Sequence, residues 1–202
     1  MIVSHRHRFV FIKTRKTAGT SLEIFLSQFC GTEDIVTPIE PHVEPHVARN
    51  HHGFYNHIPA SEVRDRIGKE LWQDYFSFCV ERNPWDKTLS SYHMVNFRRK
   101  GTLSFEDYLA KSNFCVDHPA YTEPGRPDTL MVDRVLQYEN LSGALTEVFG
   151  ALGIPYSGSL GVNAKSEYRT DRRAYREVYS PAQARRVEEA FAREIGLFGY
   201  SF

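Results

Sequence analysis

Continuous apolar runs alternate with segments of helical periodicity along the chain. One run covers residues 9–13 and another covers residues 75–80, and each is followed by a short polar turn and then by a helical pattern. Apolar runs of this length predict strands that are buried on both faces. The helices are expected to end near Gln28 and near Arg99. A strand, a turn and a helix in this order are typical of α/β domains.

The helix after the second run has clear signals at its start. Asn83 is a favourable N-cap, and Pro84 fits the first helical position. At about 100° per residue, one stripe of this helix holds Trp85, Leu89, Tyr92 and Asn96, and the opposite stripe holds Asn83, Lys87 and Ser90. We expect Trp85 and Leu89 to be buried, which leaves Arg82 and Ser90 free to face a ligand.

Shorter signals predict the other elements. One helix is expected between His57 and Gly68, another after Ser104, a strand and a helix over residues 134–153, and a final helix after Ser180. Thr20 and Glu23 have the spacing of a capping box. Residues 2–8 are expected to form a polar lead-in, and residues 30–58, 112–129 and 153–168 to be loops.

Composition limits the class of protein. The 202 residues are 41% hydrophobic and 25% charged with zero net charge, which predicts one domain over residues 1–202 with no general attraction to nucleic acid or membranes. We expect a three-layer α/β/α, P-loop-like fold with a central, mainly parallel sheet. Three scattered cysteines do not form a disulfide framework. The sequence has neither an 18-residue apolar run nor a signal-peptide pattern, so a soluble, cytoplasmic protein is expected.

The turn after the first strand has the features of an anion site. It reads Thr14-Arg15-Lys16-Thr17-Ala18-Gly19-Thr20-Ser21 and leads directly into a helix. A glycine lets the backbone approach an oxyanion closely, and a helix N-terminus adds partial positive charge. Lys16 adds a full charge, so this turn predicts a site for a phosphate or sulfate group.

A P-loop NTPase is one interpretation of this turn, but the fit is incomplete. No glycine lies five residues before Gly19, and Thr20 stands where the lysine of a P-loop is found. The alternative function is therefore a small-molecule kinase that uses ATP and magnesium through a degenerate P-loop. A second anion site favours a different ligand: Arg82 follows the second strand, and Ser90 lies eight residues later on the next helix.

Together the two turns resemble the nucleotide-binding loops of the sulfotransferases that use 3′-phosphoadenosine 5′-phosphosulfate (PAPS). The likeness is to the small bacterial relatives of the carbohydrate (heparan and chondroitin type) sulfotransferases. It extends to Glu139-Asn140-Leu141, to Asn163 and to the closing Phe198-Gly199-Tyr200, and so covers most of the chain. It implies transfer of a sulfuryl group from PAPS to an acceptor hydroxyl, with adenosine 3′,5′-bisphosphate (PAP) as the product and no metal. The chain departs from the family pattern at two positions: Arg15 stands where family members commonly have proline, and Ala18 stands where glycine is frequent.

The resemblance also implies roles for individual residues. The amides of residues 17–21, with the hydroxyls of Thr17, Thr20 and Ser21, would hold the 5′-phosphosulfate, and Lys16 would stabilise charge on the leaving phosphate oxygen. Arg82 and Ser90 would hold the 3′-phosphate. Lys165 and Arg169 lie in a basic stretch that would close over the nucleotide; a solvated basic loop is the other interpretation.

His57 is the candidate general base. It directly precedes the predicted helix at Ile58, where the resembled enzymes carry their catalytic histidine, and imidazole titrates near neutral pH. A histidine that merely packs or caps the helix is the alternative, and His51 and His52 are reserve candidates. A zinc site at His42 and His46 would need a helix that the neighbouring prolines disfavour.

The acceptor is the least determined part of the hypothesis. The resemblance favours a carbohydrate, and the expected partner is a small-molecule or glycan acceptor with no nucleic acid and no membrane. The basic run Arg98-Arg99-Lys100 could meet an acidic acceptor or be a solvated helix end. A third interpretation is a sensor that binds PAPS without turnover. The oligomeric state and the adenine contacts stay open.

Overall fold

The computed structural model describes residues 1–111, 114–161, 168–169, 171 and 173–202. Its main sheet has the order β3-β1-β2-β4-β7, formed by Ile35–Val36, Ile2–Ser4, Phe9–Phe11, Phe76–Glu81 and Arg134–Gln137. β4 is parallel to both β2 and β7, whereas β1 is antiparallel to its two neighbours β2 and β3. Within the described residues β3, β2, β4 and β7 therefore run in one direction, and the predicted mainly parallel sheet is confirmed.

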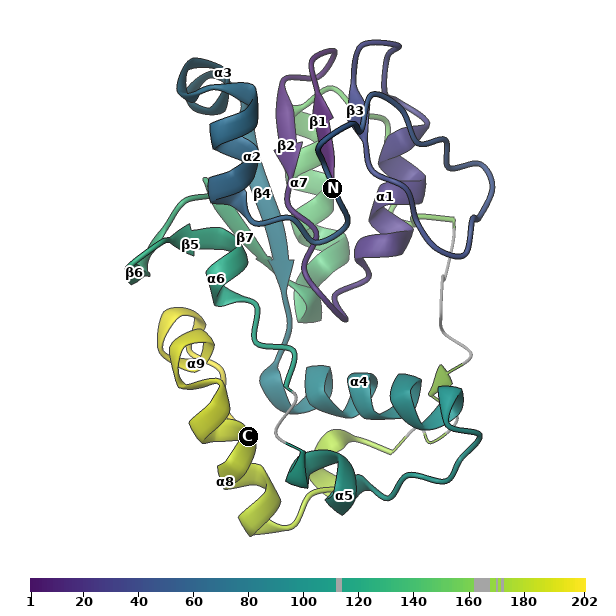
Figure 1. Ribbon diagram of the computed structural model, residues 1–202, viewed down its shortest axis with the longest axis vertical. Coiled ribbons are helices and arrows are strands. Elements are labelled where there is room, and N and C mark those ends of the chain that lie inside the picture. Colours follow the sequence, from purple (N-terminus) through teal and green to yellow (C-terminus); the bar gives the residue numbers. More distant parts are fainter. Residues whose placement is uncertain (112–113, 162–167, 170, 172) are drawn as a thin grey trace.

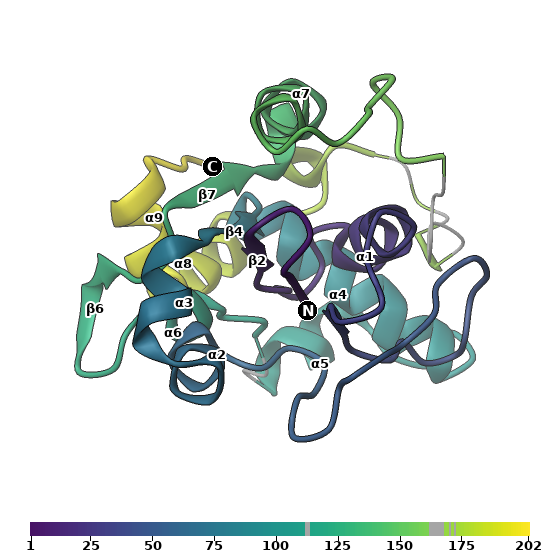
Figure 2. The same ribbon diagram turned by 90° about the horizontal axis from the view of Figure 1, so that it is seen from above.

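Helices cover both faces of this sheet (Figures 1 and 2). Alternate strand residues point to opposite sides. Phe9, Phe11 and Phe78 pack with α1 (Gly19–Ser27) and α7 (Leu141–Ala151) on one side. Val10 and Cys79 pack with α2 (Ala60–Ile67) and α3 (Lys69–Asp74) on the other. The predicted three layers are thus present, and the thiol of Cys79 is completely buried in the core.

A further hydrophobic cluster lies beyond the carboxyl ends of the parallel strands. It contains Trp85 and Leu89 of α4 (Pro84–Arg98), packed against α5 (Phe105–Ala110) and α8 (Pro181–Ala190). α9 (Ala192–Phe198) continues from α8, and these helices make up the lower half of the molecule in Figure 1. The space between them and the sheet is where the two predicted anion loops lie.

Several elements differ from the expectation. Residues 2–8 are not a polar lead-in, because Ile2 and Val3 are completely buried in β1 and only the residues after them form a turn. The 112–129 stretch contains α6 (His118–Tyr121) and β5 (Thr122–Glu123), and β5 pairs with β6 (Arg126–Leu130). The final helix is two helices, because the chain leaves helical geometry at Phe191.

The helix caps show where local signals were sufficient. The Asn83 side chain accepts hydrogen bonds from two amides of α4, and Ser104 and Ser180 cap α5 and α8 as predicted. The capping box of Thr20 and Glu23 is wrong: α1 begins after Ala18 with no side-chain cap, and the buried Glu23 carboxylate instead pairs with the Lys13 ammonium.

Short 3₁₀ helices cover Tyr138–Asn140 and Tyr175–Glu177. In the part of the chain that the structure describes, no helix combines the length and apolar character needed to cross a membrane.

Candidate active site

Both anion loops leave the carboxyl ends of neighbouring parallel strands, so they lie side by side. The first loop follows β2 and the second follows β4. A direct bond joins them, because Arg82 Nη1 donates to the Lys16 carbonyl oxygen at 3.0 Å. Ligand sites of open α/β sheets form at this edge. The two predicted sites are therefore parts of a single one.

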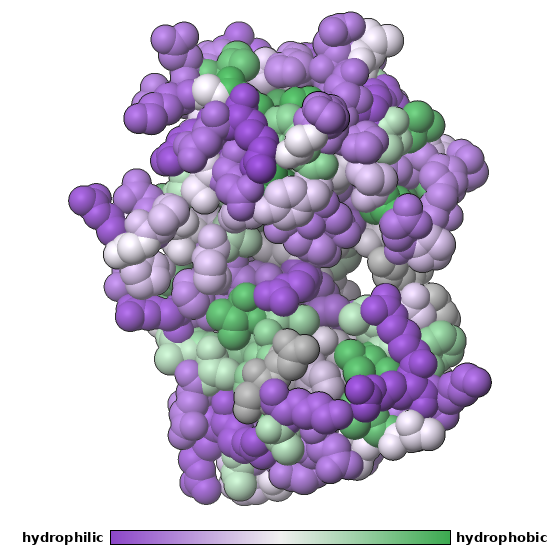
Figure 3. All heavy atoms as spheres, viewed as in Figure 1, coloured by the Kyte–Doolittle hydropathy of each residue, from purple (hydrophilic) through white to green (hydrophobic). Residues whose placement is uncertain are grey.

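The loops line a cavity of about 780 Å³ between the sheet and α4. Figure 3 shows a hollow at this level of the molecule, between the upper and lower halves. Predicted site residues that line the cavity are Lys16, Thr17, Ala18, Gly19, Thr20, Ser21, His57, Arg82, Ser90 and Arg169. Lys165 and Asn163 lie outside the described residues. The structure thus brings together every predicted site residue that it describes.

Positive charge dominates the described part of the cavity wall. Its basic residues are Lys13, Arg15, Lys16, Arg82, Arg98, Arg169 and Arg173, and its acidic residues are Glu40 and Asp86. Seven basic side chains against two carboxylates, in a protein whose net charge is zero, indicate an anionic ligand. The local cluster provides an attraction that the chain as a whole lacks.

The first loop has a backbone that needs small residues at two positions. Ala18 lies in the left-handed region at φ 60°, which explains why glycine is frequent there in the resembled family. Gly19 begins α1, and a Cβ on it would lie 2.8 Å from Lys13 Cγ. Gly19 is therefore required by close packing. The result is a tight turn that ends at the positive end of α1.

The Thr17 hydroxyl has a role within the loop itself. It lies 2.8 Å from the Thr14 hydroxyl, and the Thr17 side chain is completely buried. Thr14 in turn donates to the Val80 carbonyl oxygen of β4. These contacts fix the first loop against the strand that leads to the second. They also give the Thr17 hydroxyl a partner inside the protein, in addition to its predicted ligand.

The Arg82 side chain is held in place from several sides. Its Nε and Nη2 donate to Asp86 Oδ2 at 3.0 and 2.6 Å, and its guanidinium carbon lies 4.1 Å from the centre of the Tyr138 ring. With the bond to Lys16, these contacts use three of the guanidinium N–H groups, and others are left for a ligand. Arg82 is therefore oriented toward the cavity before any ligand arrives.

Asp86 is a site residue that the sequence analysis missed. Its carboxylate pairs with two of the residues predicted to bind the nucleotide, Arg82 and Arg169, and Arg169 Nη1 lies 2.6 Å from Asp86 Oδ1. Burial would raise the pKa of Asp86, but the two arginines outweigh it and lower this pKa. The i,i+4 spacing of Arg82 and Asp86 at the start of a helix was the signal that could have found the pair. Nothing local pointed to Arg169 or to Tyr138 as their neighbours.

His57 lines the same cavity, next to the residue that precedes the first loop. Its Nδ1 lies 2.9 Å from the Lys13 carbonyl oxygen, and its backbone has a φ of 64°. A carbonyl only accepts hydrogen bonds, so Nδ1 carries the proton and Nε2 of the neutral ring keeps its lone pair. Burial lowers the pKa of His57, which favours this neutral form near pH 7. The ring thus has the protonation state of a general base.

The other histidines of this stretch do not share the arrangement. The cavity lining formed by the described residues includes His57 but neither His51 nor His52. His42 Nε2 is 2.8 Å from the carbonyl oxygen of His46. Among the residues that the structure describes, no three His, Cys, Asp or Glu side chains form a group that could hold a metal ion.

The model of the sulfotransferase family matches residues 1–201. The chain belongs to this family. The enzyme is 36% identical over 114 residues to an uncharacterized protein of Archaeoglobus fulgidus, an alignment that covers 54% of the chain and 94% of that protein. The family match confirms the predicted family and the class of transferase.

Two solved sulfotransferases were compared with the chain. A sulfotransferase from Alicyclobacillus acidocaldarius matches at 16% identity over 96% of both chains, with a TM-score of 0.46. The crystal structure of mouse sulfotransferase SULT7A1 complexed with PAP matches with a TM-score of 0.55 at 14% identity, and the match covers 96% of the chain and 86% of that structure. The match to the mouse enzyme confirms the predicted α/β/α, P-loop-like fold.

Proposed function

We propose that the enzyme transfers a sulfuryl group from PAPS to an acceptor hydroxyl, with PAP as the second product. The basic cavity suits a nucleotide that carries phosphate groups at two positions, because its cations divide between two adjoining loops. The hydrogen bond from Arg82 to the Lys16 carbonyl oxygen joins these two loops. The mouse sulfotransferase of similar fold is described as a complex with PAP, which supports this donor.

The first loop acts on the 5′ end of the donor. The amides of residues 17–21, with the hydroxyls of Thr20 and Ser21, hold the phosphosulfate at the positive end of α1. Lys16 stabilises the charge that develops on the leaving phosphate oxygen, which is the kind of preorganised electrostatic contact that lowers a transition-state barrier. With a lysine in this role the transfer is proposed to need no metal ion.

The second loop selects the 3′-phosphate. Arg82 binds it through the N–H groups that Asp86 and Lys16 leave available, and Ser90 lines the same wall two helical turns along α4. Arg169 joins the group through Asp86. This arrangement gives ATP no corresponding benefit, because ATP has no phosphate at its 3′ position. The kinase alternative leaves these arginines without a function.

The observation that carries the proposal is the orientation of His57. With its Nδ1–H donated to Lys13, the Nε2 lone pair is available to accept the proton of an acceptor hydroxyl as sulfur is attacked. His57 and Lys16 line one cavity, so base and leaving-group stabiliser act on the same bound molecule. A binding-only sensor needs neither group.

A carbohydrate or another hydroxyl-rich small molecule is the proposed acceptor. The cavity is also lined by the exposed polar side chains of Glu40 and of Asn56, the residue before His57, which can hydrogen-bond to hydroxyl groups. Arg98 of the basic run also lines the cavity, and it offers a contact to an acidic substituent. Nucleic acid and membranes are not part of this proposal.

Calorimetric titration tests the donor. We expect wild type to bind PAP with micromolar affinity in the absence of magnesium, and Arg82→Ala to lose about 1.5–3 kcal/mol of that binding. Binding of ATP with magnesium in preference to PAP, or indifference to Arg82→Ala, would instead favour the kinase. A screen of hydroxyl acceptors with radiolabelled PAPS then identifies the second substrate.

A further inference from the structure

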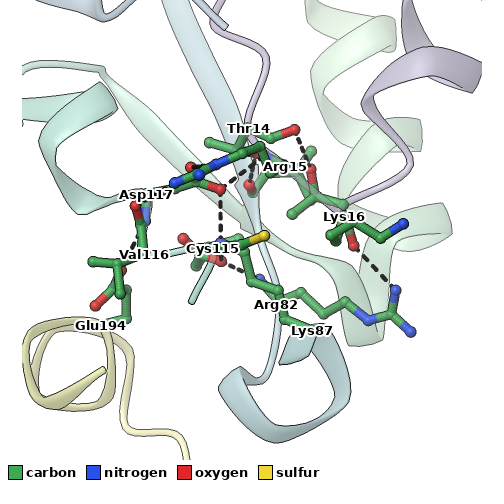
Figure 4. A network of polar contacts seen from close by, with 12 residues as sticks. Thr14, Arg15, Lys16, Arg82, Lys87, Cys115, Val116, Asp117 and Glu194 are labelled. Atoms are coloured by element: carbon green, nitrogen blue, oxygen red, sulfur yellow. Dashed lines mark hydrogen bonds and ion pairs between the residues drawn. The ribbon is translucent and has the colours of Figure 1, made fainter. Parts of the chain in front are cut away.

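A buried cluster of charged side chains lies directly beneath the two loops, and its centre is Asp117 (Figure 4). Asp117 Oδ2 accepts the backbone N–H of Arg15 at 2.7 Å, and Oδ1 accepts Arg15 Nε, also at 2.7 Å. Arg15 Nη2 donates to the neighbouring Val116 carbonyl oxygen at 2.7 Å. Arg15 immediately precedes Lys16. The residue before the leaving-group lysine is therefore clamped by three hydrogen bonds to one short segment.

The same carboxylate also contacts the second loop. Lys87 Nζ, from α4, lies 2.9 Å from Asp117 Oδ2 and 2.6 Å from Glu81 Oε1. Glu81 is the last residue of β4, and its Oε1 also accepts the backbone N–H of Arg82 at 2.8 Å. Asp117 thus reaches the first loop through Arg15 and the second through Lys87.

Two cations contact the carboxylate of Asp117, Arg15 and Lys87. Glu81 and Asp117 are two buried carboxylates that share Lys87, and Arg15 supplies the second cation. Burial raises the pKa of Glu81 to about 7 despite Lys87. Burial also opposes ionisation of Asp117, but Lys87 and Arg15 outweigh it and lower this pKa. Loss of either cation would leave the buried Asp117 carboxylate with one opposite charge fewer, which is unfavourable for a buried ion.

The segment that carries Asp117 is itself fixed from below. Glu194 of α9 is completely buried, and its Oε1 accepts the backbone N–H groups of Asp117 and His118 at 3.1 and 3.2 Å. Figure 4 shows Glu194 beneath the segment and Arg15 above it. Asp117 therefore cannot follow Arg15 if the first loop moves, and the clamp resists such motion.

Arg15 holds the first loop through hydrogen bonds, whereas a proline at this position would hold it in another way. Proline fixes its own φ but has no N–H. Arg15 uses its N–H and its side chain to attach the loop to Asp117. We propose that Asp117 is a positioning residue of the sulfuryl transfer: through Arg15 and Lys87 it sets the distance between the two loops, so that one ligand contacts both at once. This inference rests on the proposed function.

Ligands that touch one loop or both loops provide the test. PAP has both phosphates, whereas adenosine 5′-monophosphate and adenosine 3′-monophosphate each have one. In Arg15→Ala we expect the affinity for PAP to fall roughly tenfold more than the affinity for either monophosphate, because only PAP benefits from a preset spacing. Arg126→Ala, which removes an exposed arginine whose ion pair is with Glu123, is the matched control.

Salt distinguishes positioning from simple loss of charge. At roughly 0.5 M salt a charge effect is largely screened, whereas a lost spacing persists. The selective loss for PAP is expected at both low and high salt, and Asp117→Asn, checked for folding by circular dichroism, should reproduce it. Equal weakening of all three nucleotides, or a loss that disappears in salt, would overturn the inference. If the wild type does not bind PAP, the proposed function itself is wrong. If the wild type binds PAP and Arg15→Ala binds it equally well, only the positioning role of Asp117 is wrong.

Discussion

Replacing His57 with asparagine tests its role as a base separately from its hydrogen bond to the Lys13 carbonyl oxygen. The amide nitrogen of the new side chain would occupy about the place of imidazole Nδ1 and can still donate to the Lys13 carbonyl, which accepts at 2.9 Å in the wild type. Asparagine also tolerates the positive φ of 64° better than most residues. The substitution removes only Nε2. We therefore expect His57→Asn to fold and to bind PAP like the wild type.

The expected loss is confined to the chemical step. Removal of a general base slows catalysis by about 10²–10⁴-fold, or about 2.7–5.5 kcal/mol in the barrier. The assay is transfer of labelled sulfuryl groups at saturating PAPS, with calorimetric PAP affinity measured in parallel. A variant that retained more than about a tenth of wild-type turnover would refute the role of His57. Loss of PAP binding would show that the residue is structural.

The pH profile gives an independent measure of the same residue. Burial lowers the pKa of His57, so the ring is neutral above this lowered pKa and gains a proton only as the pH falls through it. Wild-type turnover should therefore stay constant through neutral pH and decline on the acidic side, below the usual range for histidine. In His57→Asn this acidic limb should be absent. An unchanged limb in the variant would assign the titration to another group.

Three further substitutions test the packing around the site. Gly19→Ala adds a methyl group 2.8 Å from a side-chain carbon, so we expect about 1–3 kcal/mol of lost stability in urea unfolding, together with weaker PAP binding. Lys87→Met leaves Glu81 and Asp117 without their shared cation, which should cost about 3–5 kcal/mol in the same measurement and less at low pH, where the carboxylates are protonated. Ser180→Ala removes the cap of α8 and should lower the free energy of unfolding by about 1 kcal/mol without changing PAP affinity. A stable Lys87→Met, or a Ser180→Ala that loses PAP binding, would contradict the assigned roles.

The site was predictable because its parts follow one another in the sequence. The strand before Thr14, the glycine at position 19 and the helix after it are close together in the chain, and Arg82 and Ser90 lie on one turn and helix. Parallel strands then bring the two loops together without any further information. This is why local patterns predicted the site residues that the structure brings together in the cavity.

Long-range pairing is what the sequence did not reveal. Glu23 had the spacing of a capping residue, but Lys13 lies close enough in the fold to pair with its carboxylate. The β1 strand has three residues, all buried. A strand this short, followed by a polar turn, has no periodicity that could be recognised in the sequence. Asp117 follows a stretch that reads as a loop, and its partners lie up to 102 residues away. Such contacts are set by tertiary packing.

The sharing of Asp86 between Arg82 and Arg169 has a consequence for turnover. A carboxylate between two guanidinium groups neutralises part of their positive charge when the site is empty. The arginines therefore lose less electrostatic stabilisation when a phosphate group leaves them. The same carboxylate repels the departing phosphate. A transferase must free its spent nucleotide in every cycle, and in many enzymes this release limits the rate. Under the proposed function, Asp86 would thus weaken the binding of the product, and the site would give up some affinity for faster release.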